Sequence, residues 1–183
     1  MSCTSVETPV IMQTPTPTPT ALVKTIEDYA KESYPVKGYD PRYSEVIKLL
    51  SKNYPLTLPC ETELFLKAII NAESNFNNAS VYKEPPPLNI NSIGFFQLSL
   101  SDAKIYGCKF KTEADIQNPI LNIECAFKIF TKLSKKYPNE SIWEYGGRYF
   151  STLRWNVYPK WATKKQSGFN RIRSYLSKNG CEI

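Results

Sequence analysis

Histidine is absent from the 183 residues of this chain. Catalytic triads with an imidazole base, histidine-ligated metals and histidine-based pH switches are therefore excluded. Any chemistry must use carboxylates, hydroxyls, amines or thiols. The sequence also has no run of about 18 apolar residues, so we expect no segment of it to span a membrane.

Cysteine occurs five times, but never in the Cys-x-x-Cys spacing typical of zinc sites, iron–sulfur clusters and redox motifs. We therefore expect no metal and no organic cofactor. Cys60, Cys108, Cys125 and Cys181 lie in the part of the chain predicted to fold, and they allow three pairings. Disulfides indicate an exported protein, secreted or held in the periplasm or envelope.

The first residues differ in composition from the remainder. Thr and Pro alternate from Thr14 to Thr20, so we predict that residues 1–21 form a Thr/Pro-rich tail or linker and that residues 22–183 form one domain. Cys3 lies alone in this tail. It is interpreted either as the lipid-bearing first residue of a mature lipoprotein, the only expected link to a membrane, or as a free thiol.

The chain is basic, with 23 Lys and Arg against 17 Asp and Glu and a net charge of +6. This excess favours an anionic partner such as a wall polymer, a membrane surface or a nucleic acid. From Tyr145 onward, basic and aromatic residues are interleaved and Glu182 is the only acid. That mixture suits a glycan with anionic groups and would also suit single-stranded nucleic acid. Since no nucleic-acid motif is present, we expect no nucleic-acid partner.

Apolar residues recur at helical spacing along most of the domain. One apolar stripe predicts a helix over residues 62–76, with Glu73 at its margin. Further helices are predicted over residues 22–30, 41–50, 101–107, 119–137, 142–153 and 167–179. Between residues 77 and 98, Asn, Ser and three consecutive prolines predict a loop with one hairpin. The expected fold is mostly α, with this short region between the helix of Glu73 and the later core helices.

Two motifs near Glu73 resemble those of a known family. Residues 73–77, Glu-Ser-Asn-Phe-Asn, end the apolar helix, and Ser-Ile-Gly-Phe-Phe-Gln-Leu follows at 92–98. Their order resembles the signature of the lysozyme-like transglycosylases, the soluble lytic transglycosylase domain and its goose-type lysozyme relatives. The resemblance covers about residues 56–154 and implies a lysozyme-like fold.

The resemblance also implies roles for individual residues. Glu73 corresponds to the general acid, Ser92 and Gln97 to residues that line the sugar cleft, and Asn122 to the residue that opens the next core helix. The family's Tyr-Asn-Ala-Gly segment is replaced here by Trp-Glu-Tyr-Gly-Gly-Arg-Tyr-Phe at 143–150.

Two tyrosines of that replaced segment are candidates for binding substrate. Tyr145 and Tyr149 lie four residues apart and would share one face of a helix. Ordinary packing in the core is the alternative for each of them.

Glu73 also has the right physical setting for an acid. A glycosidic oxygen leaves readily only if it is protonated as the bond breaks, and a carboxyl group keeps its proton near neutral pH when apolar surroundings desolvate it. A glutamate that ends a helix and faces water is the alternative interpretation.

A second catalytic carboxylate is not evident. Glu84 is the only acid between Glu73 and Asp102, and its place before three prolines predicts a solvated residue in a mobile loop. Hydrolases normally place two carboxylates across the scissile bond, so a single acid favours the lytic transglycosylase route to a 1,6-anhydro product. Hydrolysis stays open if Asp102 or Glu144 approaches in the fold.

Among the pairings of the cysteines, Cys108 with Cys125 would close a loop of 16 intervening residues. A crosslink of that size stabilises a fold by about 3 kcal/mol. Cys60 with Cys181 would then join the start of the Glu73 helix to the C-terminal end.

We therefore predict a monomeric, peptidoglycan-cleaving glycosidase that acts on the MurNAc–GlcNAc β-1,4 bond through Glu73. The cysteine-rich layout is similar to that of lysozymes from predatory bacteria that are specialised for deacetylated peptidoglycan, so either form of the strand is a candidate substrate. Two alternatives remain. One is a wall-binding module that kept the lysozyme cleft without turnover, and the other is a basic nucleic-acid-binding protein.

Overall fold

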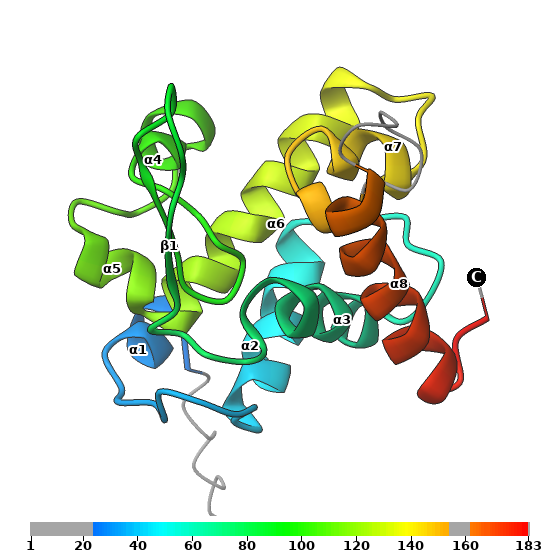
Figure 1. Cartoon of the computed structure of the whole chain (residues 1–183). Coiled ribbons are helices and arrows are strands. Elements are labelled where there is room, and N and C mark those ends of the chain that lie inside the picture. The colour runs from blue at the N-terminus through cyan, green and yellow to red at the C-terminus, as the bar shows by residue number, and fades with distance from the viewer. Residues whose placement is uncertain (1–23, 154–161, 183) are drawn as a thin grey trace, which may run out of the picture.

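The computed structural model describes residues 24–153 and 162–182. The chain is mostly helical and surrounds one long helix, α6 (Pro119–Lys136), which runs obliquely through the middle of Figure 1. Helix α6 begins at Asn118, whose side chain accepts hydrogen bonds from the N–H groups of Ile120 and Leu121. It ends at Tyr137, directly before Pro138. The prediction of a mostly α fold is confirmed.

The other elements form two groups, one on each side of α6 (Figure 1). The first group contains α1 (Ile26–Ala30), strands β1 (Val81–Lys83) and β2 (Asn91–Ile93), α4 (Ser101–Tyr106) and α5 (Glu113–Gln117). The second contains α2 (Arg42–Asn53), α3 (Thr62–Ser74), α7 (Ile142–Gly147), the 3-10 helix η1 (Ser151–Leu153) and α8 (Ala162–Lys178).

Helix α3 carries Glu73 in its last turn. Within the predicted apolar stripe, Phe65, Ala68 and Ile69 are fully buried. Leu66 and Ile70, which the periodicity places at the margin of the stripe, are fully buried as well. The helix ends at Ser74 because the next residue adopts a left-handed conformation, with φ 51°. The end of α3 therefore places Glu73 where the core meets the surface.

The predicted hairpin is present. Strands β1 and β2 are antiparallel, with Val81 opposite Ile93 and Lys83 opposite Asn91. The segment after β2 turns sharply at Gly94, which has φ +79°, and a Cβ there would lie only 2.5 Å from the side-chain nitrogen of Asn122. Only glycine fits at this position, and its close approach to Asn122 holds the hairpin against α6.

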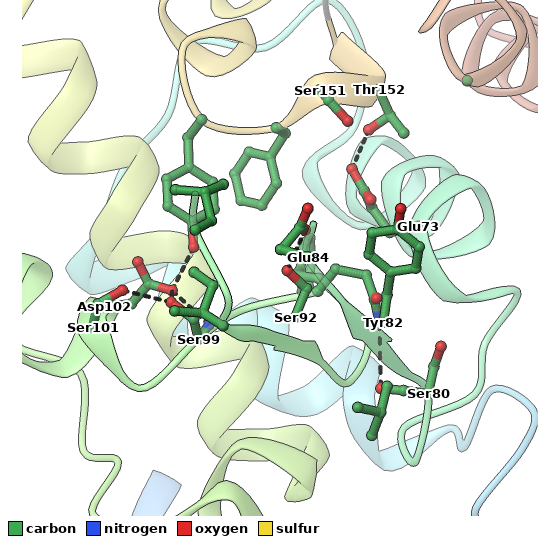
Figure 2. A pocket seen from close by; sticks show the side chains of 18 of the residues that line it. Glu73, Ser80, Tyr82, Glu84, Ser92, Ser99, Ser101, Asp102, Ser151 and Thr152 are labelled. Atoms are coloured by element: carbon green, nitrogen blue, oxygen red, sulfur yellow. Dashed lines mark hydrogen bonds between the residues drawn. The ribbon is translucent and has the colours of Figure 1, made fainter. Parts of the chain in front are cut away.

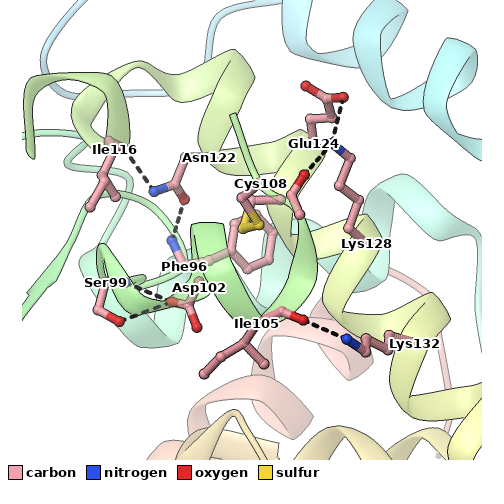
Figure 3. The surroundings of a disulfide bond; sticks show 12 residues. Phe96, Ser99, Asp102, Ile105, Cys108, Ile116, Asn122, Glu124, Lys128 and Lys132 are labelled. Carbon is pink, nitrogen blue, oxygen red and sulfur yellow. Dashed lines mark hydrogen bonds and ion pairs between the residues drawn. A yellow bond between two sulfur atoms is a disulfide. The ribbon is translucent and has the colours of Figure 1, made fainter. Parts of the chain in front are cut away.

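Asn122 makes that attachment through three backbone groups, and Figure 3 shows two of them, in Phe96 and Ile116. Its side chain accepts from the N–H of Phe96 at 2.9 Å and donates to the carbonyls of Ile93 and Ile116 at 3.2 and 2.9 Å. Ile93 ends β2, Phe96 lies in the turn that follows, and Ile116 belongs to α5. A buried amide that satisfies them stabilises the irregular backbone beside the cleft.

Helix α7 is shorter than predicted. The periodicity indicated a helix to Leu153, but α7 ends at Gly147 and a separate 3-10 turn follows. Two adjacent glycines weaken a helix, and Gly146 packs so closely against Leu153 that a Cβ would lie 2.7 Å from its Cδ1. Helix α5 was not predicted, although the capping box of Thr112 and Asp115 is a signal for it.

Two disulfides brace the two groups of elements. Cys60 and Cys181 join the start of α3 to the end of α8, across a separation of 121 residues. Cys108 and Cys125 join the segment after α4 to α6, across 17 residues (Figure 3). These are the pairings that the sequence analysis considered. No helix among residues 24–153 and 162–182 is both long and apolar enough to cross a bilayer.

Several predictions concern residues outside the described part of the chain. They are the Thr/Pro-rich tail with Cys3, and the stretch of basic and aromatic residues over 154–161.

Candidate active site

A cleft of about 1030 Å³ opens between the two groups of elements (Figure 2). We call its two sides the helical wall and the hairpin wall. The helical wall consists of Ala72, Glu73, Ser151, Thr152, Gly168 and Arg171. The hairpin wall, with the segments around it, consists of Ser80, Val81, Tyr82, Glu84, Pro85, Leu88, Ile90, Ser92, Phe96, Gln97, Ser99, Ser101, Asp102, Ile105, Tyr106, Tyr149 and Phe150.

Glu73 projects from the end of α3 into this cleft (Figure 2). Its Oε1 accepts a hydrogen bond of 2.5 Å from the hydroxyl of Thr152. Burial raises the pKa of Glu73 to about 7, although the Thr152 hydrogen bond and the charge of Arg171 oppose the rise, while the charge of Glu84 adds to it. The carboxyl group therefore holds a proton in a substantial fraction of molecules at neutral pH.

Thr152 is placed by η1, and η1 is pressed against α8. The approach depends on Gly168, where a Cβ would lie 2.9 Å from the side-chain methyl of Thr152. A larger residue at 168 would push the threonine toward Glu73. The sequence analysis found neither Thr152 nor Gly168, because no motif marks a contact between residues 79 positions apart.

Glu84 directly follows β1 as a loop residue, and it lines the cleft. It is half-buried, and its carboxylate accepts a hydrogen bond of 2.7 Å from the hydroxyl of the buried Ser92. Its backbone N–H donates to the carbonyl of Ile90 at 2.8 Å. The pairing of β1 with β2 orders this residue. Figure 2 shows Glu84 and Ser92 between Glu73 and Asp102.

Asp102 closes the far end of the cleft. It accepts hydrogen bonds from the backbone N–H of Ser99 at 2.7 Å, from the hydroxyl of Ser99 at 3.1 Å and from the phenol of Tyr149 at 2.5 Å. Burial and the charge of Asp102 raise the pKa of Tyr149 well above its usual range, so the phenol remains a donor. The hairpin wall thus ends in a fixed hydrogen-bonded cluster.

The family model for the transglycosylase SLT domain matches residues 61–166, more than half of the chain. The chain belongs to this family. The match covers α3, the hairpin and the elements that line the cleft. The resemblance of the motifs around Glu73 to this family is thereby confirmed.

Solved structures of DslA support the fold of this SLT domain. The wild type superimposes with a TM-score of 0.57 at 20% identity, and a variant with one glutamate changed to glutamine superimposes with 0.56 at 20% identity. In both cases the match covers 77% of this chain and 91% of DslA. No curated protein sequence matches the chain. The lysozyme-like fold is confirmed, and family membership supports a peptidoglycan-cleaving function of the lytic transglycosylase type.

The two candidate tyrosines of the SLT domain lie in different places. Tyr149 lines the cleft, whereas Tyr145 is 4% exposed and packs in the core instead. The shared helix face that the sequence suggested does not exist, because α7 ends between the two residues. Glu144 also lies outside the cleft and caps α7 through Ser141, which lowers the pKa of its carboxyl group.

The other residues with roles predicted from the sequence are Ser92, Gln97 and Asn122, and each makes hydrogen bonds within the fold. Ser92 and Gln97 line the cleft, and the amide of Gln97 donates to the carbonyl of Gly94 at 2.8 Å. Gln97 therefore also stabilises the turn in which it lies. Asn122 is buried behind this turn and does not line the cleft. Within residues 24–153 and 162–182, no group of three acidic or cysteine side chains is arranged to hold a metal.

Proposed function

We propose that this SLT domain cleaves the β-1,4 bond between MurNAc and GlcNAc in peptidoglycan, with Glu73 as the general acid. One observation carries the proposal. Glu73 faces an open cleft, and burial raises its pKa to about 7, near the pH at which an acid must both hold a proton and release it.

The reaction follows from this placement. Glu73 transfers its proton to the glycosidic oxygen as the bond from that oxygen to C1 of MurNAc breaks, and positive charge develops at C1. The resulting carboxylate then accepts a proton from the group that attacks C1. That group is either the 6-hydroxyl of the same MurNAc, which gives a 1,6-anhydro product, or water, which gives a reducing end. Family membership favours the 1,6-anhydro product.

We propose Glu84 as a second carboxylate of the site. It lies in the same cleft as Glu73, its charge acts on Glu73, and Ser92 holds it in position. Two of the solved DslA structures are variants that each have a different glutamate changed to glutamine, and the two glutamates lie eleven positions apart, the separation of Glu73 and Glu84 here. A carboxylate on the opposite wall would stabilise the charge that develops at C1.

Sugar contacts are proposed for the residues that line the cleft near these acids. Ser92, Gln97 and Tyr149 present hydroxyl and amide groups to it. Because Glu84 and Asp102 add carboxylates to the hairpin wall, strands with free amino groups are a favourable substrate. We propose that deacetylated peptidoglycan is cleaved at least as well as the acetylated form.

The substrate and the two disulfides support a place outside the cytoplasm, in the envelope or in the medium. The proposed catalytic side chains all come from one chain, so a monomer is sufficient for activity. A lipid on Cys3 is proposed as the only membrane link, and intact-mass measurement of the native protein tests it.

Digestion of purified peptidoglycan tests the function. Acetylated and deacetylated walls are incubated with the wild type, Glu73→Gln and Glu84→Gln, and the released muropeptides are identified by mass spectrometry. We expect 1,6-anhydro products from the wild type, none above background from Glu73→Gln, and at least about tenfold less from Glu84→Gln. Reducing-end products would indicate a hydrolase. Wall binding without any product would indicate the inactive binding module instead.

A further inference from the structure

The charges that line the cleft are unevenly distributed. The acids are Glu73, Glu84 and Asp102, and the only cation among the described residues that line it is Arg171. Arg171 extends from α8 on the helical wall, beside Glu73. Negative charge is therefore concentrated on the hairpin wall, and positive charge is confined to one position on the other side.

No contact with the rest of the fold explains why an arginine stands at position 171. Arg42 and Arg148 are each held by carboxylates, namely Asp40 and Glu32 for the first and Glu140 for the second. Arg171 is exposed, and no hydrogen bond or ion pair within residues 24–153 and 162–182 holds it. Its guanidinium is available to a ligand in the cleft.

Acid catalysis does not explain Arg171 either. Its charge lowers the pKa of Glu73 and so favours the ionised form of a group that must donate a proton. A cation that opposes the chemistry of its neighbour requires another reason for its position. Binding of an anion on the substrate supplies one.

We propose that Arg171 binds a carboxylate on the lactyl or peptide substituent of the muramic acid residue. This inference rests on the proposed function. In a peptidoglycan strand the glucosamine residues carry no carboxylate, whereas each muramic acid carries one on its lactyl group or on the attached peptide. A guanidinium matches a carboxylate with two parallel hydrogen bonds.

This contact sets the register of the strand. Sugars of the two kinds alternate, so a shift by one residue would place beside Arg171 a glucosamine, which has no carboxylate. The same shift would bring the carboxylate of the next muramic acid toward the hairpin wall, where Glu84 and Asp102 repel it. Arg171 would thus select the MurNAc–GlcNAc bond and discriminate against uncharged glycans.

The test compares strands that differ only in this charge. Peptide-free glycan strands are used with the lactyl carboxylate either free or converted to its methylamide. Cleavage by the wild type, Arg171→Gln and Arg173→Gln is measured as kcat/KM below pH 6, where Glu73 is protonated in each. Arg173 is a matched control, because it is exposed on the same helix but does not line the cleft.

We expect amidation to lower kcat/KM about tenfold for the wild type and for Arg173→Gln, but not for Arg171→Gln. An equal effect of amidation on all three proteins would overturn the proposal. In peptide-bearing strands the lactyl carboxyl is already bound in an amide, so a second comparison uses these strands with the peptide carboxylates either free or amidated. It distinguishes the peptide carboxylate from the lactyl one.

A binding assay separates this inference from the proposed function. Affinity for the same two strands is measured in the inactive Glu73→Gln background, with and without Arg171→Gln. If the wild type cleaves no strand, the proposed function fails, and the binding assay still tests Arg171. We expect amidation to weaken binding only where Arg171 is present. Binding that does not change with amidation would refute the contact.

Discussion

The two walls of the cleft present their acidic side chains in opposite ways. On the helical wall, Glu73 is hydrogen-bonded by one residue, Thr152, through its hydroxyl and its backbone, and it faces the cleft. On the hairpin wall, Asp102 receives three hydrogen bonds from Ser99 and Tyr149. The first carboxyl group is free to exchange a proton with a ligand, whereas the second is occupied in holding the loop and Tyr149 together.

The comparison shows how similar side chains are given different tasks. Burial outweighs the hydrogen bonds from Thr152 and leaves the pKa of Glu73 at about 7. A set of convergent donors instead fixes a side chain in one position and ties together the segments that carry them. The surroundings of each carboxyl group, rather than the residue type, separate the proposed catalytic acid from the structural one.

The largest expected effect is on the free energy of unfolding, and it concerns the two disulfides. Cys60–Cys181 lies on the side of the helical wall, and Cys108–Cys125 lies on the side of the hairpin wall. Replacing both Cys60 and Cys181 by Ala removes a crosslink across 121 residues and should cost about 4.9 kcal/mol, since the entropy that the crosslink removes from the unfolded chain rises with loop length. Replacing Cys108 and Cys125, 17 residues apart, should cost only about 3 kcal/mol. Urea unfolding gives the free energy of unfolding of both variants. A larger loss of stability on removal of Cys108–Cys125 than of Cys60–Cys181 would contradict the prediction.

The second prediction separates the two acids. Glu73→Gln should lower the cleavage rate at least about a hundredfold, with little change in stability, because it removes the transferable proton. Asp102→Asn should destabilise the fold by about 1–3 kcal/mol, since the neutral amide replaces the charged acceptor of the buried donors and adds an N–H donor beside them. Rates and melting temperatures are measured for both. If Asp102→Asn were as stable as the wild type and cleaved more slowly than Glu73→Gln, Asp102 would be the catalytic acid and Glu73 would not.

The third prediction concerns the pH profile. Thr152 lowers the pKa of Glu73, so Thr152→Val should raise it further above about 7 and keep the acid protonated to higher pH. The alkaline limb of kcat/KM against pH should therefore move upward. Thr152→Ser keeps the hydroxyl and should leave the limb in place. A downward shift in Thr152→Val would mean that the hydrogen bond does not set this pKa.

The smallest effect is expected at the contact between η1 and α8. Gly168→Ala improves helix propensity but places a Cβ 2.9 Å from the methyl of Thr152, so we expect a severalfold loss of activity. The exposed Ser177→Ala on the same helix serves as the control. Activity and melting temperature are measured for both variants. Full activity in Gly168→Ala would show that Thr152 can adjust without disturbing Glu73.

Much of the helical wall could be predicted, because the sequence patterns that specify it involve residues close together in the chain. The apolar stripe before Glu73 and the motif at residues 73–77 indicated both the helix and its acid, and Asn118-Pro119 marked the start of α6. The hairpin wall was predicted only in outline. The position of Glu84 depends on the register between β1 and β2. The three prolines interrupt the sequence pattern there, so this register could not be predicted.

The amino-acid sequence by itself determined that chemistry here excludes imidazole, that the fold is mostly helical, and that Glu73 ends an apolar helix. Only the tertiary structure decided which groups surround that acid. Thr152 and Arg171 reach Glu73 from η1 and α8, and Glu84 reaches the cleft from the hairpin. The reason is physical: a pKa depends on burial and on charges nearby in space, and distant segments supply both.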